Sequence, residues 1–302
     1  MSFDITILSA KNSSSKAYKL EADRLVKVPQ ASSHSTPYSG VVKSFETLAG
    51  FRDHLASMQP DMINLYGVPT KNVGTEEFLI LPKWEVESVI DGVDTNDQER
   101  VFSRTKENFQ FPIKKSSIFM VDIDDSEDID SDITKILTAV PQLANAQYVR
   151  QFSSSSNIFY NGKLLKKPTG VHLYWLFDDA SAVPSIAKII FDTLVLKGHG
   201  HIKLASNGAM LTRSLIDMMV YQPERIDFAG GALLLSEGLT QHREPILLNA
   251  HLPAVVQTAS IKPLTAKQTK EVAAIWNALK GNAEPLSLAK SDAWVKEAKT
   301  ED

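Results

Sequence analysis

The sequence contains no cysteine, so disulfides, thiolate zinc sites and cysteine nucleophiles are all excluded. Long hydrophobic runs are missing too. No apolar stretch approaches the roughly 18 residues of a membrane span, and the first residues lack the basic-then-apolar order of a signal peptide. The Gly-Lys-Ser/Thr loop pattern of P-loop enzymes is also absent, which excludes a helicase motor from this sequence. We therefore expect a cytoplasmic protein without a membrane partner.

Basic and acidic residues are both present in moderate numbers. The 302 residues include 32 Lys or Arg and 36 Asp or Glu, for a net charge of −4. A polyanionic partner would therefore need a local basic patch on an acidic surface. Hydrophobic residues make up 43% of the chain, which is enough for one sizeable core or two smaller ones.

Hydrophobic patterning predicts an alternation of strands and helices, which favours an α/β or α+β fold. Early in the chain we expect a strand over 3–8, another over 17–28, a helix from an N-cap at Ser44 to Pro60, and a strand over 62–68. Further along we expect a helix capped by Asp130 or Ser131, a strand over 147–152, a hairpin at Asn161-Gly162, a helix over 184–196, a loop over 202–210, and two helices, 265–280 and 287–300, separated at Gly281.

The stretch 117–125 is the focus of the chain. Five of its first seven residues are apolar, which predicts a buried central strand that ends in acids. On a strand Asp122 and Asp124 point to one face, whereas Asp125 points away. Two neighbouring carboxylates suit Mg²⁺ or Mn²⁺ better than zinc. The alternative is a solvated strand end in an acidic turn.

Two other apolar segments each contain a polar residue that needs a partner. His172 lies within 170–177, where a neighbouring strand could bring it beside the Asp pair, although a satisfied core histidine would have the same pattern. Asp217 interrupts the apolar run 213–220, which we interpret as a third strand. Three carboxylates can hold two divalent cations for phosphoryl transfer. Asp227 is interpreted as a turn residue and is left out of the site.

Hydroxyls and cations lie close to these segments in sequence. The loop 153–156 consists of four serines, and a basic run at Lys163, Lys166 and Lys167 follows it. Together with Arg213 or Arg225, such groups could hold a phosphate tail by charge-assisted hydrogen bonds. A flexible surface hairpin is the alternative interpretation of 153–167.

Taken together, these motifs resemble the archaeo-eukaryotic primase superfamily, in particular phage- and plasmid-type primase-polymerase domains. The resemblance rests on Val-Asp-Ile-Asp at 121–124, Gly-Val-His-Leu-Tyr at 170–174 after the serine loop, and Leu-Ile-Asp at 215–217 followed by Pro-Glu-Arg-Ile-Asp-Phe at 223–228. With 104–111 ahead of the first motif, it covers roughly residues 100–231. Each motif is weak alone, but their order and spacing are fairly specific.

The resemblance implies an α+β fold with an RRM-like catalytic core over 111–250, an N-terminal α/β subdomain over 1–110 and C-terminal helices over 251–302. It implies a DNA primase/polymerase that transfers nucleotides from (d)NTPs on single-stranded DNA during phage or plasmid replication in the bacterial cytoplasm. A replicative helicase, separate or fused at the C-terminus, is a further expected partner.

Site residues follow from the same resemblance. It implies two divalent cations, Mg²⁺ or Mn²⁺, held by the catalytic Asp122, Asp124 and Asp217. The family commonly has Ser two residues before the motif histidine, where this chain has Gly170, so the hydroxyl contact would come from Thr169 or from the 153–156 loop. The expected nucleotide-binding residues are His172, Ser154, Ser155, Thr169, Lys167, Arg213 and Arg225.

Three alternatives to a primase-polymerase are compatible with single motifs or have to be excluded. His199-Gly-His201 with a tyrosine elsewhere is compatible with a rolling-circle nicking endonuclease, but this leaves Asp122 and Asp217 unexplained. A replication initiator could keep the fold and bind DNA without catalysis. A calcium loop starting at Asp122 is excluded, because Glu127 stands where Gly is needed and Ile133 where Glu is needed.

Overall fold

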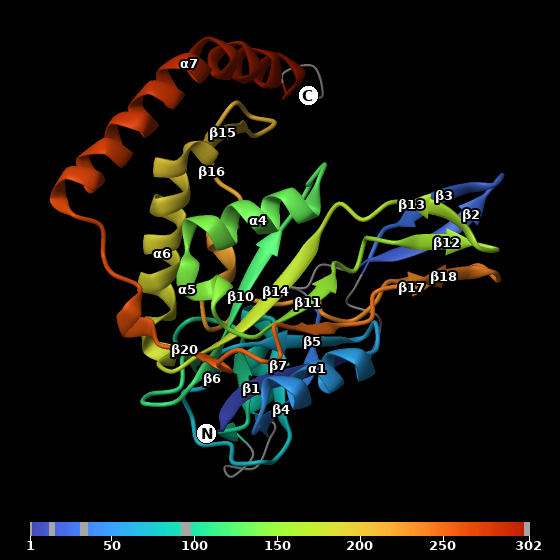
Figure 1. Ribbon diagram of the computed structural model, residues 1–302. Helices are drawn as coiled ribbons and strands as arrows, with labels where there is room; N and C mark the ends of the chain where they lie inside the picture. Colours follow the sequence, from blue (N-terminus) through green and yellow to red (C-terminus); the bar gives the residue numbers. More distant parts are fainter. Residues whose placement is uncertain (1, 12–15, 31–35, 92–97, 299–302) are drawn as a thin grey trace.

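The protein is an α+β structure of mostly antiparallel sheets, as the sequence predicted (Figure 1). The computed structural model describes residues 2–11, 16–30, 36–91 and 98–298. Two larger sheets form the body, a small two-layered arm projects from one side, and a long helix runs across the top (Figure 1). Within the described ranges, no helix combines the length and hydrophobicity that a bilayer crossing requires.

The first sheet is built from the N-terminal third of the chain. Its order is β5 (Met62–Leu65), β1 (Phe3–Ala10), β4 (Tyr38–Phe45), β7 (Phe78–Leu81) and β8 (Val101–Ser103). Two short segments, β6 (Val68–Pro69) and β9 (Phe109–Gln110), pair beside it, and α2 (Lys83–Ile90) lies between β7 and β8 in sequence.

The predicted start of the first helix was wrong. Ser44 lies in β4, where its hydroxyl bonds Asp4 on the paired strand β1. The helix is α1 (Leu48–Ser57), and its N-cap is Thr47, whose hydroxyl accepts from the amide of Gly50 at 3.0 Å. Phe45 therefore ends a strand. It lies at helical spacing from the apolar residues of α1 only by coincidence.

The second sheet contains the strands that carry the sequence motifs. Its order is β10 (Ser117–Ile123), β14 (Val171–Phe177), β11 (Tyr148–Phe152) and β19 (Ile246–Leu248), with β20 (Val255–Val256) parallel to the end of β14. β10 is therefore an edge strand, not the expected central one, and β14 takes the central place. The edge of β10 is covered where the Asp217 amide donates to the Asp122 carbonyl at 3.3 Å.

Helices cover both faces of the second sheet. One face packs against α4 (Ile129–Ala139), α5 (Pro141–Ala144) and α6 (Val183–Leu194). The other face packs against α1 and the first sheet, where the rings of Phe51 and Tyr174 meet edge to face at 5.4 Å. The two sheets thus share α1 and form one packed body. α6 has Pro184 in its first turn as predicted, whereas α4 is capped by Asp128 instead of Asp130 or Ser131.

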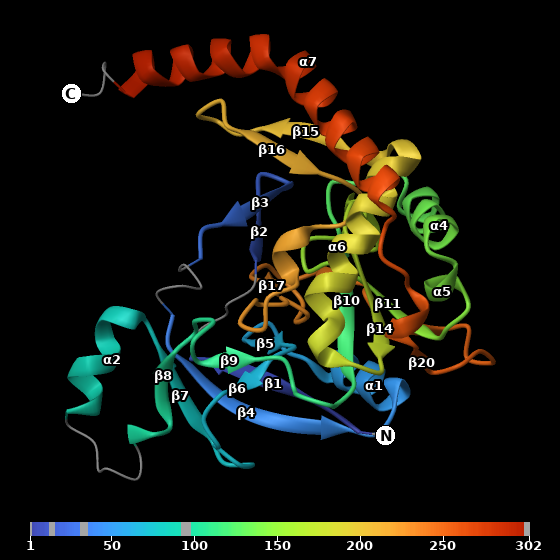
Figure 2. The same ribbon diagram turned by 90° about the vertical axis from the view of Figure 1, so that its left-hand side faces the viewer.

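The C-terminal part differs most from expectation. Residues 202–210 were predicted as a loop, but β15 (His201–Leu204) and β16 (Met210–Arg213) form a hairpin that follows a π-helical turn (Val195–His199). Instead of two helices there is one, α7 (Ala266–Ala298), which continues through Gly281 and Pro285. α7 runs above the hairpin (Figure 2), and the Ser287 hydroxyl donates to the Gly208 carbonyl at 2.7 Å in the hairpin turn.

The arm is a pair of small sheets around a core of their own. Residues 17–28 were expected as one strand, but they form a hairpin that turns at Ala22 and Asp23, both with positive φ. The hydrophobic core between the two sheets includes Tyr18, Ile158 and Leu239. One sheet contains β17 (Leu233–Leu234), β2 (Ala17–Glu21) and β3 (Arg24–Val28), and the other contains β13 (Lys163–Lys166), β12 (Ile158–Tyr160) and β18 (Leu239–Gln241).

Candidate functional site

The register of β10 and β14 brings the first two motifs together. Asp122 lies directly opposite His172 in the antiparallel ladder, and Asp122 Oδ1 is 3.4 Å from His172 Nε2. The expectation that a neighbouring strand brings His172 beside the aspartates is confirmed for Asp122. Asp122 lies near the end of the sheet where β10 runs into an acidic loop.

A pocket of about 550 Å³ opens at this end of the sheet. Asp122, Asp124 and Asp217 all line it, although they come from segments almost 100 residues apart. Asp125, which the sequence analysis set aside, also lines the pocket, with φ of +54° and its Oδ2 3.4 Å from Lys203 Nζ. The three predicted carboxylates therefore share one cavity.

Asp217 reaches the pocket from a different element than predicted. It lies in a loop, not in a strand, and caps the short 3₁₀ turn Met218–Val220 by accepting from the amide of Met219 at 3.0 Å. Its Oδ1 also lies 3.4 Å from an Arg213 guanidinium nitrogen. The apolar residues around Asp217 pack against the core next to α6, which explains why the segment resembled a strand.

Asp122 is a frustrated carboxylate. Burial raises its pKa to about 6, an effect that His172 opposes and the carboxylates of Asp124, Asp227 and Asp217 reinforce. Apart from the 3.4 Å contact with His172 Nε2, its buried Oδ1 has no hydrogen-bond donor among the described residues. A buried carboxylate oxygen with only such a long contact favours a further cation as partner.

The residues around the pocket are of a chemical type that binds divalent cations. All of the predicted ligands are carboxylates, which hard ions such as Mg²⁺ and Mn²⁺ prefer, and one ligand oxygen, Asp122 Oδ1, makes no hydrogen bond beyond its long contact with His172. Nowhere in the described ranges, however, are three or more His, Asp or Glu side chains already gathered as a metal-binding group. Binding would require these side chains to close around the ion.

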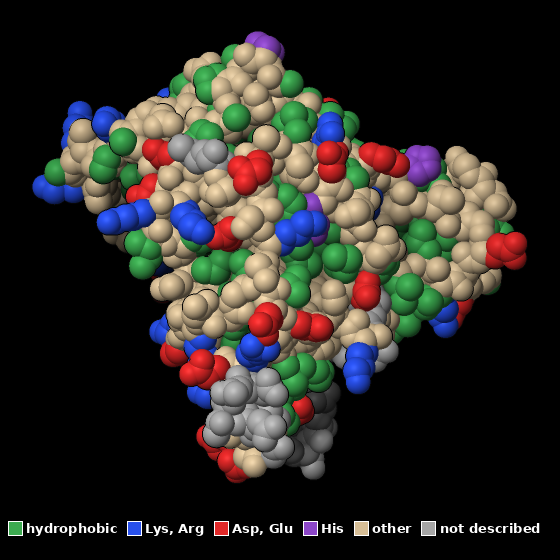
Figure 3. Space-filling model, turned by 90° about the horizontal axis from the view of Figure 1, so that it is seen from below, with side chains coloured by type: hydrophobic (Ala, Val, Ile, Leu, Met, Phe, Trp, Pro, Cys, Tyr) green, Lys and Arg blue, Asp and Glu red, His purple; other side chains and the backbone are tan. Residues whose placement is uncertain are grey.

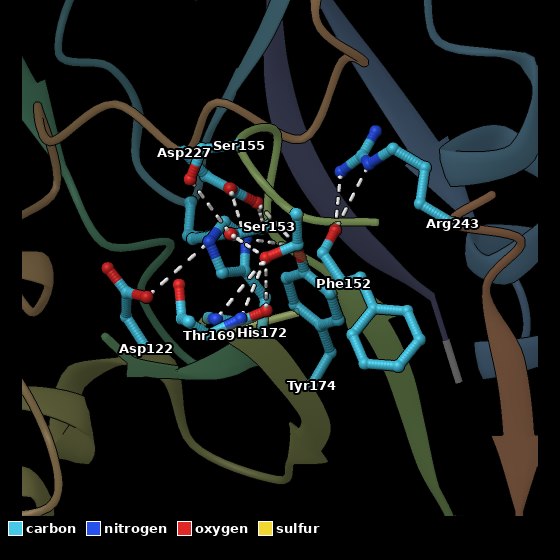
Figure 4. Close-up of polar contacts among 12 residues, drawn as sticks. Asp122, Phe152, Ser153, Ser155, Thr169, His172, Tyr174, Asp227 and Arg243 are labelled. Atoms are coloured by element: carbon cyan, nitrogen blue, oxygen red, sulfur yellow. Dashed lines mark hydrogen bonds and ion pairs between the residues drawn. The ribbon is translucent and has the colours of Figure 1, made fainter. Parts of the chain in front are cut away.

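Behind Asp122 lies a buried network that the sequence analysis missed (Figure 4). His172 Nδ1 is 3.0 Å from Asp227 Oδ1, and Asp227 Oδ2 accepts hydrogen bonds from the hydroxyls of Tyr174, at 3.0 Å, and Tyr66. Asp227 is 2% exposed, and its backbone pairs with Asn64 beside β5. It is thus the best-partnered carboxylate of the site and not a turn residue.

Charges in this network support one another. Burial would raise the pKa of Asp227, but His172 and the two tyrosine hydroxyls lower it below the ordinary value. Burial would likewise lower the pKa of His172, but Asp122 and Asp227 raise it above the ordinary value. The two carboxylates therefore favour the charged form of the imidazole that lies between them.

The serine loop is folded tightly against the start of β14. Ser156 Oγ accepts from the amides of Thr169 and Gly170, each at 3.3 Å, and lies 3.0 Å from Ser153 Oγ. The predicted Ser154 is buried, and Ser155 Oγ lies 3.4 Å from Ser153 Oγ. Ser153 and Ser156, which were not predicted, thus organise this loop.

Gly170 explains the departure from the motif noted in the sequence. A Cβ at this position would lie 2.6 Å from Ser153 Oγ and 3.2 Å from Asp124 Oδ1. A side chain at 170 would therefore collide with the Ser153 hydroxyl, which occupies that place itself. The only residue that fits here without a shift is glycine.

The predicted cations divide into two groups. Arg213 lines the pocket, together with Lys203 and His201 from the hairpin and Lys135 from α4, none of which was predicted. Lys167 is exposed at the base of the arm, and Arg225 donates to the Gln222 side chain at 2.9 Å; neither lines the pocket. Lys203 was missed because its segment was interpreted as a loop.

His201 lines the same pocket, whereas His199 ends the π-helical turn on the other side of Gly200. The two histidines therefore do not converge with a third ligand in the described part of the chain. Comparisons of the sequence with family models and curated proteins, and of the structure with solved structures, give no match.

Proposed function

We propose that the protein is a nucleotidyltransferase of the primase-polymerase type, which extends a primer on single-stranded DNA from nucleoside triphosphates. The observation that supports this most is the pocket itself. Carboxylates from β10 and its following loop line it together with cations from the β15–β16 hairpin, here called its acidic and cationic walls. A polyphosphate held between such walls meets cations for its charge and acids for metal ions.

Each wall has a separate task in this proposal. Lys203 and Arg213 bind the phosphate tail by charge-assisted hydrogen bonds, and the charged His172 lies behind Asp122 to hold its orientation. Asp122, Asp124 and Asp217 would hold two divalent cations, Mg²⁺ or Mn²⁺, which when bound would stabilise charge on the reacting phosphate. Ser153 and Asp124 both lie against Gly170, and the Thr169 carbonyl accepts from the amide of Ser126, a pocket residue, at 2.8 Å.

The wider setting belongs to the same proposal. The second sheet would be the RRM-like core of the enzyme, its template a single DNA strand, and its context phage or plasmid replication in a bacterial cytoplasm. A replicative helicase in a separate chain or domain would be its partner. These statements rest on the motif resemblance and on the pocket's charges.

The decisive experiment is incorporation of labelled nucleotides on an unprimed single-stranded template with Mg²⁺ or Mn²⁺, comparing ribo- and deoxyribonucleotides in parallel. Asp122→Asn and Asp217→Asn should each lower synthesis by at least about 100-fold, because one metal-ligand position is lost. Asp53→Asn, at an exposed position on α1, should leave synthesis unchanged. Near wild-type synthesis by either pocket variant would refute the assignment.

Two other functions predict different results. A non-catalytic replication initiator would bind DNA but incorporate no nucleotide under any metal condition. A rolling-circle nicking enzyme would form a covalent protein-DNA adduct that survives denaturation, and it would depend on His199 and His201.

A further inference from the structure

The arm carries a charge opposite to that of the rest of the molecule. Its strands and turns, residues 17–28, 158–167 and 233–241, contain six Lys or Arg and three Asp or Glu, so their net charge is +3. The other 26 basic and 33 acidic residues give the remainder −7. On the body, acidic and basic side chains are interspersed over the face seen from below (Figure 3). The arm is thus a local basic patch of the kind a polyanion requires.

Most of these cations are unengaged. Lys19 pairs with Glu21 and Lys166 lies over the Tyr18 ring at 6.0 Å, but Arg24, Lys27, Lys163 and Lys167 make no ion pair with any described residue. All four are exposed. They belong to β3, β13 and the residue after β13, which are neighbouring strands of the two small sheets (Figure 1).

The outer face of β12, β13 and β18 is aromatic and apolar. Ile158 and Tyr160 point into the arm's core, so the residue between them, Phe159, points outward. Its ring stacks on the exposed His242 ring, with the centroids 4.7 Å apart, and its cross-strand neighbour Leu164 is 45% exposed. Lys163 pairs with Tyr160 on the edge strand β13, so this cation and the ring stack lie on opposite faces of the same small sheet. Aromatic rings and lysines on one element are the combination that binds the bases and phosphates of single strands.

The base of the arm joins the pocket directly. The serine loop 153–156 leads from β11 into the arm, and residues 167–170 lead back into β14. Gln241 on β18 fixes this base, donating to the carbonyls of Ser154 at 3.1 Å and Ser156 at 2.7 Å. Gly170 lies against Asp124, so a strand lying along the arm would be led to the carboxylates.

We propose that the arm is a binding surface for single-stranded nucleic acid, with phosphates held by Lys163, Lys167 and the cations of β3, and a base stacked on Phe159. This rests on the proposed function, because it supplies the path by which the template reaches the pocket. It explains why a small sheet with its own core projects from the body and why its charge is reversed.

Edge protection is a different use for lysines on a strand such as β13, because charged edges prevent strand-to-strand aggregation. That use accounts for Lys163 but not for the stack of the half-buried Phe159 ring on the exposed His242 ring, which would itself promote association. The two uses also differ in outcome, since only one requires a ligand.

The test is fluorescence anisotropy with a labelled 20-nucleotide oligo(dT), measured over a range of salt concentrations and without nucleotides. Lys163→Ala/Lys167→Ala should weaken binding at least about fivefold and reduce the slope of log K against log salt by about 1.4, which corresponds to two lost phosphate contacts. The matched control Lys267→Ala/Lys270→Ala removes two exposed lysines from α7 and should change neither quantity.

Phe159→Ala should also weaken binding about fivefold or more, but with an unchanged salt slope, because a stacking contact is lost and no phosphate contact. Phe159→Leu keeps an apolar side chain in place and should weaken binding similarly, while thermal unfolding shows that the arm remains folded. Equal binding by wild type and both arm variants would overturn the proposal, as would tighter binding of a duplex of equal length. Unchanged binding with new self-association would assign the lysines to edge protection.

The two proposals fail separately. Arm-dependent binding by a protein that incorporates no nucleotide would overturn the proposed function and leave the arm's role intact. Nucleotide incorporation by a protein whose arm variants bind like wild type would overturn the arm's role alone.

Discussion

Asp122 and Asp227 flank the same imidazole, yet they are opposite cases of a buried carboxylate. Asp227 accepts two tyrosine hydroxyls and contacts His172, and its pKa is lowered despite complete burial. Asp122 Oδ1 contacts the other side of the ring at the longer distance of 3.4 Å, its carboxylate accepts no hydroxyl hydrogen bond from the described residues, and its pKa is raised to about 6.

The difference shows which carboxylate serves the fold and which faces a ligand. A satisfied buried ion supports the folded state, whereas a frustrated one lowers its stability unless a ligand compensates. Asp227 thus belongs to the scaffold, whereas Asp122 is the one that faces the ligand under the proposed function, although they share one histidine. Three sets of substitutions test this difference between Asp227 and Asp122.

The largest effect is expected for Asp227→Asn. It leaves the buried His172 cation without its best counter-ion, and the loss of a partner from a buried pair costs about 3–5 kcal/mol. Urea unfolding at pH 7 measures the loss. Because the folded-state pKa of Asp227 is lowered, its contribution exists above pH 3.8 and disappears as the pH falls below that value.

A matched change at the exposed Asp53→Asn should alter stability by less than about 0.5 kcal/mol. If Asp227→Asn were as stable as this control, Asp227 would not be the structural carboxylate of the pair.

A change of opposite sign is expected for Asp122→Asn. Its folded-state pKa of about 6 lies above the ordinary value of 3.8, so ionisation costs the folded state about 3 kcal/mol. The variant should therefore be more stable by about that amount above pH 6, and the gain should vanish as the pH falls to about 4. Thermal or urea unfolding in EDTA at pH 8 and pH 4 tests this.

Addition of Mg²⁺ or Mn²⁺ is the complementary experiment. It should stabilise the wild type and leave Asp122→Asn almost unaffected, since binding to the native state alone raises stability. A variant less stable than the wild type at pH 8 in EDTA would contradict the frustrated state of Asp122.

The smallest effect is expected at the tyrosines. Tyr66→Phe and Tyr174→Phe each remove one hydrogen bond to the Asp227 carboxylate and should cost about 2 kcal/mol. Tyr221→Phe is the control, because the buried Tyr221 hydroxyl has no hydrogen-bond partner in the described part of the chain and its removal should cost almost nothing. Equal losses in all three variants would mean that general packing, not Asp227, sets the cost.

Local pattern was sufficient for the strands at the centre of the site. β10 and β14 were evident from their apolar composition, and the position of Asp122 opposite His172 follows from the pairing of those strands. Asp227 could not be found in this way, because its partners Tyr66 and Tyr174 lie 161 and 53 residues away. Only the folded chain shows that a residue in a turn-like sequence is buried among them.

The C-terminal helix was missed for a related reason. Gly281 and Pro285 are local stop signals whose cost is about 1 and 3 kcal/mol, respectively. Contacts of the helix with the β15–β16 hairpin, such as Ser287 with Gly208, oppose that cost. Propensity at single positions does not contain such long-range contacts.

The proline inside α7 also makes the helix mechanically uneven. Pro285 has no N–H, so the carbonyl of Gly281, four residues earlier, lacks its helical donor, and both residues lie on an exposed stretch. Helices bend most readily at a proline, where such a backbone hydrogen bond is missing. Beyond Pro285, the Ser287 hydroxyl donates a hydrogen bond to the turn of the hairpin that carries Lys203 and Arg213. Through this hydrogen bond, the part of α7 beyond Pro285 is tied to the hairpin whose cations line the pocket.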